Sequence, residues 1–368
     1  MKKKLIICVD GLGKDMLSKE NSPFLFSLSN NNPSRLKTLF AFTGIEYDFF
    51  SGQTPDKTNI WLEFSKVETS IFNNPLLRFF SFNSKIRDYL GILIQLINKR
   101  TWFSGLHNIP KENLKHFDTS TKIGLWKLPF FQERNFVFYK WPFFITKQED
   151  KEKRRIIFKY ESDAERMVRL LSEKGRDIYY TQLMGVDKTT HKFGKKSLHT
   201  KKSIRITDKL IEKYSKEFLK ENKGGEVVIW SDHGFADIQN FIDLEKIIQK
   251  NAKILYFLAG TTASFWFKDK KTKDEFLKNV KDIKNVNLLD KKTAKKYKIP
   301  FNDRYGEVVL FLKKGNYFFP NHYQKKENQR FVAMHGYPEN SELDGFIVSS
   351  GRTPQMLKMD EVIKFLKG

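Results

Sequence analysis

The clearest feature of the apolar and polar pattern is a set of short apolar runs that stop at acidic residues. The runs 5–9, 177–186 and 226–231 end at Asp10, Asp187 and Asp232, respectively. A continuous apolar run bounded by turn residues is typical of a strand buried on both faces of a parallel sheet. The pattern therefore predicts a parallel sheet whose strands carry acidic residues at their carboxyl ends.

Helical patterns lie between these runs. Apolar residues recur at helical spacing over 161–173, and a basic helix is expected over about 201–222. The segment Thr43-Gly44-Ile45-Glu46 has the capping-box pattern of a helix that starts at Thr43. Strands that alternate with helices indicate a parallel sheet covered on both faces. We expect an α/β fold, a three-layer αβα sandwich with a mostly parallel central sheet. Ligands of such sheets bind at the carboxyl ends of the strands.

The pattern changes twice along the chain. Residues 62–155 carry paired phenylalanines at 79–80, 130–131 and 143–144 among Lys and Arg, and we interpret them as an aromatic-rich insertion or cap. Residues 241–329 predict a small α+β lobe, with strands at 261–267 and 307–312 around a Lys-rich helical stretch at 270–297. The α/β core then comprises 1–61, 156–240 and 330–368, and closes with a strand at 345–350 and a helix at 359–367.

Charge and composition narrow the choice of partners and of compartment. The formal net charge of +24 favours anionic partners. Lysines are scattered and no nucleic-acid motif is present, so nucleic acid is not expected. The apolar stretch from Tyr89 to Ile97 is too short to span a bilayer and leaves a core helix or a membrane-surface contact open. A single cysteine, Cys8, and a short N-terminal apolar run favour a cytoplasmic location, with membrane association as the alternative.

Acidic and histidine side chains supply the candidate chemistry. Asp187 and His191 lie four residues apart, Asp232 and His233 are adjacent, and His335 follows a further apolar stretch. Carboxylate oxygens and imidazole nitrogens suit Zn²⁺, with Mn²⁺ or Fe²⁺ as alternatives. Taken one at a time, these residues could equally be helix caps, turn formers or loop histidines.

The order of the motifs resembles the alkaline phosphatase superfamily, most closely its type I phosphodiesterase/nucleotide pyrophosphatase branch. The motifs that carry the resemblance are Asp10-Gly11, Thr43 before a helix that ends in Ser51-Gly52, Asp187-x-x-x-His191, Asp232-His233-Gly234 and His335-Gly336-Tyr337. A sulfatase is disfavoured because Thr43-Gly44-Ile45-Glu46-Tyr47 lacks the Cys/Ser-x-Pro-x-Arg pattern.

The resemblance implies two divalent metal ions and assigns their ligands. Asp10, Thr43, Asp232 and His233 would hold one ion, and Asp187, His191 and His335 the other. Thr43 would be the nucleophile and form a phosphothreonine intermediate. The chain departs from the family pattern after Thr43, which makes Asn59 only a candidate for phosphate binding, while His322 and Arg304 are candidates on the substrate side.

The function expected from these motifs is metal-dependent hydrolysis of a phosphodiester or pyrophosphate bond. A phosphomonoesterase is the first alternative, because the same ions serve both reactions. A non-catalytic protein that docks on anionic lipid or glycan is the second. The expected substrate is a phosphorylated small molecule, or a lipid- or glycan-linked phosphate if the paired phenylalanines contact an anionic membrane.

Overall fold

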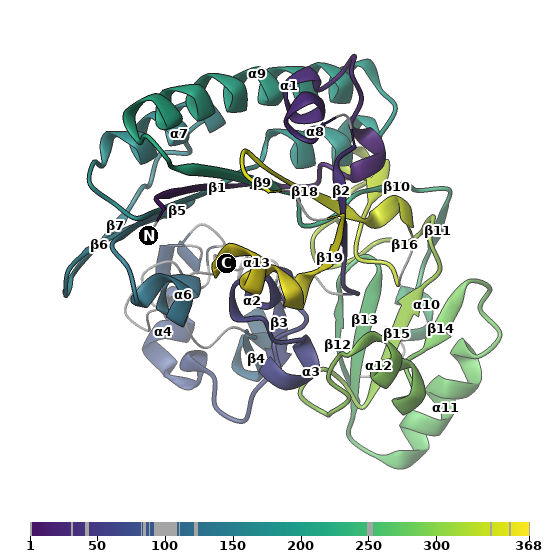
Figure 1. Ribbon diagram of the computed structural model, residues 1–368. Coiled ribbons are helices and arrows are strands. Elements are labelled where there is room, and N and C mark those ends of the chain that lie inside the picture. The colour runs from purple at the N-terminus through teal and green to yellow at the C-terminus, as the bar shows by residue number, and fades with distance from the viewer. Residues whose placement is uncertain are drawn as a thin grey trace.

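The computed structural model describes residues 2–30, 32–40, 44–81, 83, 86–87, 89–91, 109, 111–120, 124–248, 253–338, 341–352 and 355–367. A nine-stranded sheet forms the centre of the molecule, in the order β19-β2-β18-β9-β1-β8-β5-β6-β7 (Figure 1). Its strands are β1 (Lys4–Val9), β2 (Ser34–Lys37), β5 (Phe136–Lys140), β6 (Phe143–Gln148), β7 (Lys151–Ile156), β8 (Ile178–Leu183), β9 (Glu226–Trp230), β18 (Gly345–Ser349) and β19 (Met356–Lys358). Strands β9, β1, β8 and β5 run parallel, and antiparallel strands flank them on either side. The apolar runs predicted β1, β8 and β9, but not β5.

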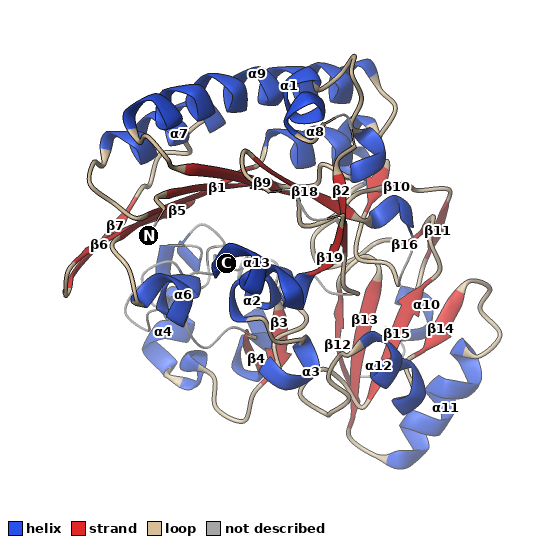
Figure 2. Cartoon of the chain, in the orientation of Figure 1, coloured by secondary structure: helices blue, strands red, loops and turns tan. Residues whose placement is uncertain are grey.

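Helices cover both faces of this sheet (Figure 2). One face carries α1 (Pro23–Leu28), α7 (Asp163–Ser172), α8 (Gly185–Phe193) and α9 (Leu198–Glu221), and the other carries α2 (Gly44–Ser51), α6 (Pro129–Gln132) and α13 (Val362–Lys367). Strand β1 contributes side chains to the cores on both faces of the sheet, because successive side chains of a strand point to opposite faces. Ile6 and Cys8 pack with α2, whereas Leu5 and Ile7 pack with α7 and α9. The three-layer αβα sandwich is confirmed.

A smaller lobe follows the Asp232 loop. It contains the antiparallel sheet β12-β13-β15-β14, formed by β12 (Ile254–Leu258), β13 (Thr262–Phe267), β14 (Val286–Leu288) and β15 (Val308–Leu312), with α10 (Glu245–Ile248), α11 (Lys270–Val280) and α12 (Lys291–Tyr297). The stretch 270–297, expected to be one helical segment, is two helices separated by β14. Asp269 and Asp290 each cap one of these helices through a backbone N–H three residues on, which explains why two helices begin in this stretch.

The region expected to be an insertion ends earlier than residue 155. Residues 136–156 form β5, β6 and β7, which extend the central sheet from β8. What remains of the region contains α4 (Pro75–Phe80), α6 and the two-stranded sheet of β3 (Phe64–Lys66) and β4 (Phe117–Thr119), and the short helix α3 (Pro55–Thr58) precedes it. The alternation of side chains in β5 and β6 is hard to detect because aromatic residues occupy both faces, and this explains the misplaced boundary.

The paired phenylalanines are mostly core residues. Phe130, Phe131, Phe143 and Phe144 are each at most 2% exposed, whereas Phe79 is 68% exposed. Most of the stretch 89–97 lies outside the described residues. Within the part of the chain that the structure describes, no helix is long and apolar enough to cross a membrane.

Candidate active site

The carboxyl ends of β1 and β9 place two acidic residues side by side. Cys8 of β1 pairs in register with Trp230 of β9, so Asp10 and Asp232, each two residues further on, lie just beyond the ends of adjacent parallel strands. The backbone N–H of Gly11 donates to Asp232 Oδ1 over 3.1 Å. Gly11 has φ +69°, and a Cβ there would lie 2.6 Å from the ring of Phe235 and 3.0 Å from Asp187 Oδ1. Glycine is therefore required at this turn.

The next strand supplies a carboxylate and an imidazole through a helix. Asp163 accepts hydrogen bonds from the N–H groups of Met184 (3.0 Å) and Gly185 (2.9 Å), which starts α8 directly after β8. Asp187 and His191 lie one helical turn apart on α8 and so share a face. His191 Nε2 lies 3.5 Å from Asp187 Oδ1.

A short antiparallel ladder brings in the last histidine from far along the chain. Strand β10 (Ala236–Asp237) follows the Asp232-His233-Gly234 loop and pairs with β17 (Ala333–Met334), with Ala236 opposite Met334. His335 comes next, and its ring stacks on that of His233 with centroids 3.6 Å apart and planes at 12°. The structure thus brings together all six of the predicted metal ligands that it describes.

The six donors form two overlapping groups. Asp10, Asp232 and His233 offer ligand atoms that all lie within 4.8 Å of one another, and so do Asp187, His233 and His335. His233 Nε2 lies 3.4 Å from Asp10 Oδ1 and 3.6 Å from Asp232 Oδ2. The first group comprises three of the four ligands predicted for one ion, and the fourth, Thr43, lies outside the described residues. The second differs from the predicted set in including His233, which lies between the two groups, while His191 contacts Asp187.

Backbone carbonyls orient two of the imidazoles. His191 Nδ1 lies 3.0 Å from the carbonyl oxygen of Ala333, and His233 Nδ1 lies 3.2 Å from that of Gly234. A carbonyl oxygen only accepts, so Nδ1 carries the proton in each contact and Nε2 faces the carboxylates. This is the hydrogen-bonding pattern by which proteins orient metal-binding histidines.

Burial and mutual repulsion shift the ionisation of the pocket. Burial raises the pKa of Asp187 to about 7 and that of Asp232 to about 6, and the neighbouring carboxylates add to both shifts. Burial alone would lower the pKa of His233, but Asp232, Asp10 and Asp187 outweigh it and raise that pKa to about 9. Burial lowers the pKa of His191 to about 4 and that of His335 well below its usual value. Three crowded carboxyls beside the neutral imidazoles of His191 and His335 are an arrangement that a divalent cation would stabilise, and such an ion would displace the proton that the carboxylates hold on His233.

The donor set fits divalent metal ions. Asp187 Oδ1 is buried and accepts no hydrogen bond from the described residues. Leaving a buried carboxylate oxygen unsatisfied is costly unless a cation or proton compensates it. Oxygen and nitrogen donors in one pocket match the ligands that zinc and related ions take in proteins.

Thr43 itself lies outside the described residues. The helix expected to start there is α2, which begins at Gly44, and Ile45 and Glu46 line the same pocket as Asp10 and Asp232. Glu46 does not simply close a capping box. Its carboxylate accepts hydrogen bonds from the Lys140 ammonium and, over 2.6 Å, from the Tyr180 hydroxyl.

The other three candidate site residues have structural roles. Asn59 ends α3 in the left-handed conformation, and the Arg304 guanidinium donates to the carbonyl oxygens of Asn59 and Ser120. Asn59 and Arg304 line a separate cavity. His322 is 6% exposed, stacks on Phe257 and accepts a hydrogen bond from the Leu258 N–H through Nδ1 over 2.9 Å, so it lies behind the pocket wall.

The pocket also contains groups that the motifs did not identify. It has a volume of about 370 Å³, and its walls include Glu63, Lys140, Trp141, Phe257 and Tyr323. The Tyr323 hydroxyl donates to Glu63. Phe235 backs the imidazoles, with its ring centroid 4.8 to 5.5 Å from those of His191, His233 and His335. No recognisable spacing marks these residues, because they come from separate elements that meet only in the folded chain.

Comparisons with known proteins identify the family. The sequence model of type I phosphodiesterase / nucleotide pyrophosphatase matches residues 84–338. The chain therefore belongs to the type I phosphodiesterase/nucleotide pyrophosphatase family, within the alkaline phosphatase superfamily. It is an enzyme of the phosphoric ester hydrolase class, which replaces the non-catalytic alternative. No curated protein sequence matches it.

Solved structures agree on the fold. Human ectonucleotide pyrophosphatase/phosphodiesterase 5 has a TM-score of 0.68 at 14% identity, with 99% of this chain and 94% of that chain covered. The murine protein of the same name, solved as an inactive threonine-to-alanine variant in complex with AMP, gives 0.64 at 15%, with 100% and 94% covered. A second structure of the murine protein gives 0.63 at 16%, with 99% and 94% covered.

Proposed function

We propose that this protein is a metal-dependent hydrolase that cleaves a phosphodiester or pyrophosphate bond through a phosphothreonine intermediate. Family membership supports hydrolysis of phosphoric esters. The observation that carries the finer proposal is the convergence of Asp10, Asp187, His191, Asp232, His233 and His335 at the carboxyl edge of the sheet. One ion would be held by Asp10, Asp232 and His233 with Thr43, and the other by Asp187, His191 and His335.

Thr43 is the proposed nucleophile. It directly precedes α2, whose first residues line the pocket, so the chain connects it to the cluster of carboxylates. A helix N-terminus offers unpaired N–H groups to an anionic phosphate. The murine neighbour solved with AMP is an inactive threonine-to-alanine variant, which supports a threonine in this role.

The protein residues would divide the work of the reaction. Divalent ions, when bound, supply positive charge for the attacking and leaving oxygens of an in-line displacement. The carboxylates of Asp10, Asp187 and Asp232 would hold these ions, and the carbonyl contacts of His191 and His233 keep their Nε2 atoms directed at the pocket. Thr43 would lose its proton and attack phosphorus, and the bond from phosphorus to the leaving oxygen would break, so that the leaving group departs and takes up a proton. Water would then attack the phosphothreonine, release the bound phosphoryl group as the second product and restore the threonine hydroxyl. Zinc is the proposed metal, with manganese or iron as alternatives.

A nucleotide-type substrate is proposed over a lipid- or glycan-linked one. AMP is the ligand of the murine neighbour, and aromatic side chains of Phe257, Tyr317, Tyr323 and Phe331 line the pocket here. Aromatic rings can stack on a flat base. The phenylalanine pairs that suggested a membrane contact are largely buried in the core and give that idea no support.

Thr43→Ala tests the proposal. We expect the variant to lose at least about a thousandfold in kcat for an aryl phosphodiester, because removal of a nucleophile abolishes the covalent route. Its thermal unfolding should shift only slightly. Thr293→Ala, a threonine in the first turn of α12 in the small lobe, is the matched control and should keep full activity. An active Thr43→Ala enzyme would overturn the assignment of the nucleophile.

A further inference from the structure

A buried ion pair adjoins the metal-ligand cluster without belonging to it. Lys140 is the last residue of β5 and Glu46 lies in the first turn of α2, and their side chains form an ion pair on the pocket wall. Lys140 is 8% exposed and Glu46 is 4% exposed. The second oxygen of Glu46 accepts the hydroxyl of Tyr180, which is fully buried in β8. These contacts fix the carboxylate beside the ammonium.

The charge of Lys140 reaches the candidate metal ligands. Burial raises the pKa of Asp10 and of Asp232, and the Lys140 ammonium is among the charges that oppose this rise. Of the described residues that line the pocket, Lys140 is the only lysine or arginine. It is therefore the side chain best placed to add positive charge beyond that of bound metal ions.

Glu46 offsets that charge. Carboxyls of Asp10, Glu46, Glu63, Asp187 and Asp232 line the pocket. Once Glu46 and Lys140 neutralise each other, two divalent ions would balance the remaining carboxyls, and the pocket would be close to neutral before substrate enters. A phosphodiester carries one negative charge, whereas a phosphomonoester carries nearly two at neutral pH. The second charge would find no compensating cation.

We propose that the Glu46–Lys140 pair makes this site selective for phosphodiester monoanions over phosphomonoester dianions. Glu46 restrains the ammonium and cancels its charge, so that Lys140 does not serve as a binding group for a terminal phosphate. This inference rests on the proposed hydrolase function and names the substrate class that the site takes. It also separates the diesterase from the monoesterase alternative, which the sequence left open.

A charge-reversal cycle tests the pair. The quantity to measure is the ratio of kcat/KM for an aryl phosphomonoester to kcat/KM for an aryl phosphodiester, with the same divalent ion at mildly alkaline pH. Glu46→Gln leaves the ammonium uncompensated and should raise the ratio about tenfold or more, because one extra charge interacts within a poorly solvated pocket. Lys140→Met should lower the ratio, and the double variant should return it close to the wild-type value.

The outcomes separate this inference from the proposed function. If the pair had a purely structural role, its substitution would slow both reactions in parallel and leave the ratio unchanged. That result would overturn the inference. A wild-type enzyme that prefers the monoester would overturn it as well. If Glu46→Gln does not fold, the direction of the Lys140→Met ratio decides. Glu152→Gln, which removes a carboxylate that pairs with Lys127 away from the pocket, is the control and should not move the ratio. A wild-type enzyme that cleaves neither substrate with any divalent ion would reject the proposed function itself.

Discussion

Burial sets the protonation of individual side chains in the candidate metal pocket. The carboxyls of Asp187 and Asp232 hold their protons to a higher pH than exposed carboxyls do, with pKa values of about 7 and about 6. The low pKa of His191 keeps that imidazole neutral and ready to bind a cation. Metal binding must therefore displace protons from these carboxyls and from His233, whose pKa the surrounding carboxylates raise to about 9.

Metal affinity should consequently depend steeply on pH. Because the raised pKa values favour the protonated ligands in the metal-free protein, we expect the affinity for Zn²⁺ or Mn²⁺ to weaken as the pH falls through about 9, where His233 gains its proton, and more steeply through about 7 and about 6. Isothermal titration calorimetry in two buffers of different ionisation enthalpy would measure both the affinity and the protons released. Affinity that stays constant across this pH interval, with no proton release, would contradict the assignment of these ligands.

A second buried acid, Asp48 in α2, lies outside the metal pocket. It is 0% exposed, and neither of its carboxyl oxygens takes a hydrogen bond from the described residues. Burial raises its pKa well above the usual value, and Asp360 and Asp56 add to the shift. A carboxyl whose pKa is raised by folding prefers to be protonated in the folded chain, so its contribution to stability is lost as the pH rises through the folded pKa.

Asp48→Asn should therefore stabilise the protein at neutral pH. The amide resembles the protonated acid, and the advantage should grow with pH by up to about 1.4 kcal/mol per unit above the unfolded pKa, until the folded pKa is reached. Urea unfolding between mildly acidic and neutral pH would measure it. Asp282→Asn, at a side chain that is 83% exposed, is the control and should show no such trend. A less stable Asp48→Asn protein at neutral pH would refute the argument.

The sequence predicted the candidate metal ligands but not the buried ion pair beside them. Asp10, Asp187 and Asp232 could be predicted because each ends an apolar run, and parallel strands bring such ends together. Glu46 and Lys140 could not, because the capping-box pattern gives Glu46 another role and Lys140 is one lysine among many in a basic chain. Asn59 lies shortly after α2, where a phosphate-binding residue was expected, but it ends α3 and lines a separate cavity.

At the level of elements, α2 is held on the sheet by aromatic packing. Phe49 of α2 stacks on Trp230 of β9, with ring centroids 3.7 Å apart and planes at 17°. Both side chains are fully buried. This contact ties the helix that follows Thr43 to the strand that precedes Asp232, so it should fix the distance between the proposed nucleophile and the proposed metal ligands.

Phe49→Ala should reduce both stability and activity. Loss of a buried phenylalanine costs about 3–5 kcal/mol, and a displaced α2 should lower kcat more than tenfold, because a misplaced nucleophile loses near-attack geometry. Phe276→Ala, at a buried position of α11 that packs on Phe265, is the matched control. It should destabilise the small lobe comparably and leave kcat nearly unchanged where the protein is folded. Equal losses of kcat in the two variants would contradict a positioning role for α2.

Elements that come from distant segments were the hardest to predict. The two-residue ladder between β10 and β17 joins residues almost a hundred positions apart and places His335, but a pair so short leaves no periodicity in the sequence. Strands β5, β6 and β7 were placed in an insertion because their aromatic residues obscured the alternation of a strand. The long helix α9 and three apolar strands of the parallel sheet, β1, β8 and β9, were predicted within a few residues.

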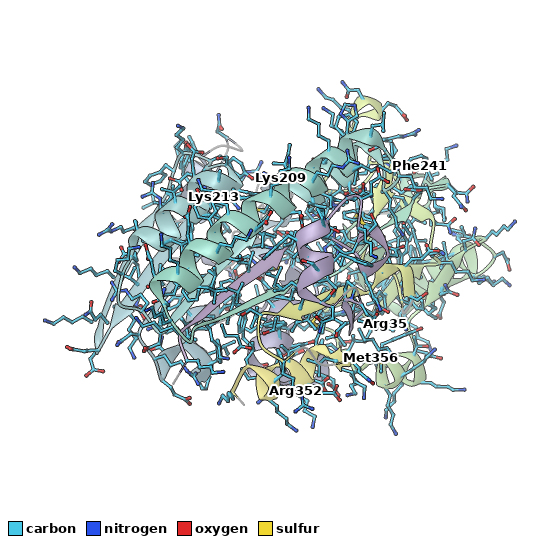
Figure 3. All side chains as sticks on the ribbon, turned by 45° about the horizontal axis from the view of Figure 1, so that its top comes forward. Arg35, Lys209, Lys213, Phe241, Arg352 and Met356 are labelled. Carbon is cyan, nitrogen blue, oxygen red and sulfur yellow. The ribbon has the colours of Figure 1, made fainter. Side chains whose placement is uncertain are left out.

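Across the whole molecule, basic surface and acidic pocket are separated. Lys209 and Lys213 are exposed one helical turn apart on α9 and extend away from the sheet (Figure 3). The pocket instead gathers five carboxyls at the carboxyl edge of the parallel strands. The net charge of +24 thus belongs largely to solvated surface, where it can attract anionic substrates over long range. In the proposed mechanism, binding of an anionic substrate at the pocket would depend on cations held there.

The most direct test is anomalous X-ray diffraction from crystals of the protein equilibrated with Zn²⁺ or Mn²⁺. The account predicts two anomalous peaks in one pocket, one bounded by Asp10, Asp232 and His233, and the other by Asp187, His191 and His335. Crystals of the folded protein with no peak among these side chains, at metal concentrations that support turnover, would contradict it.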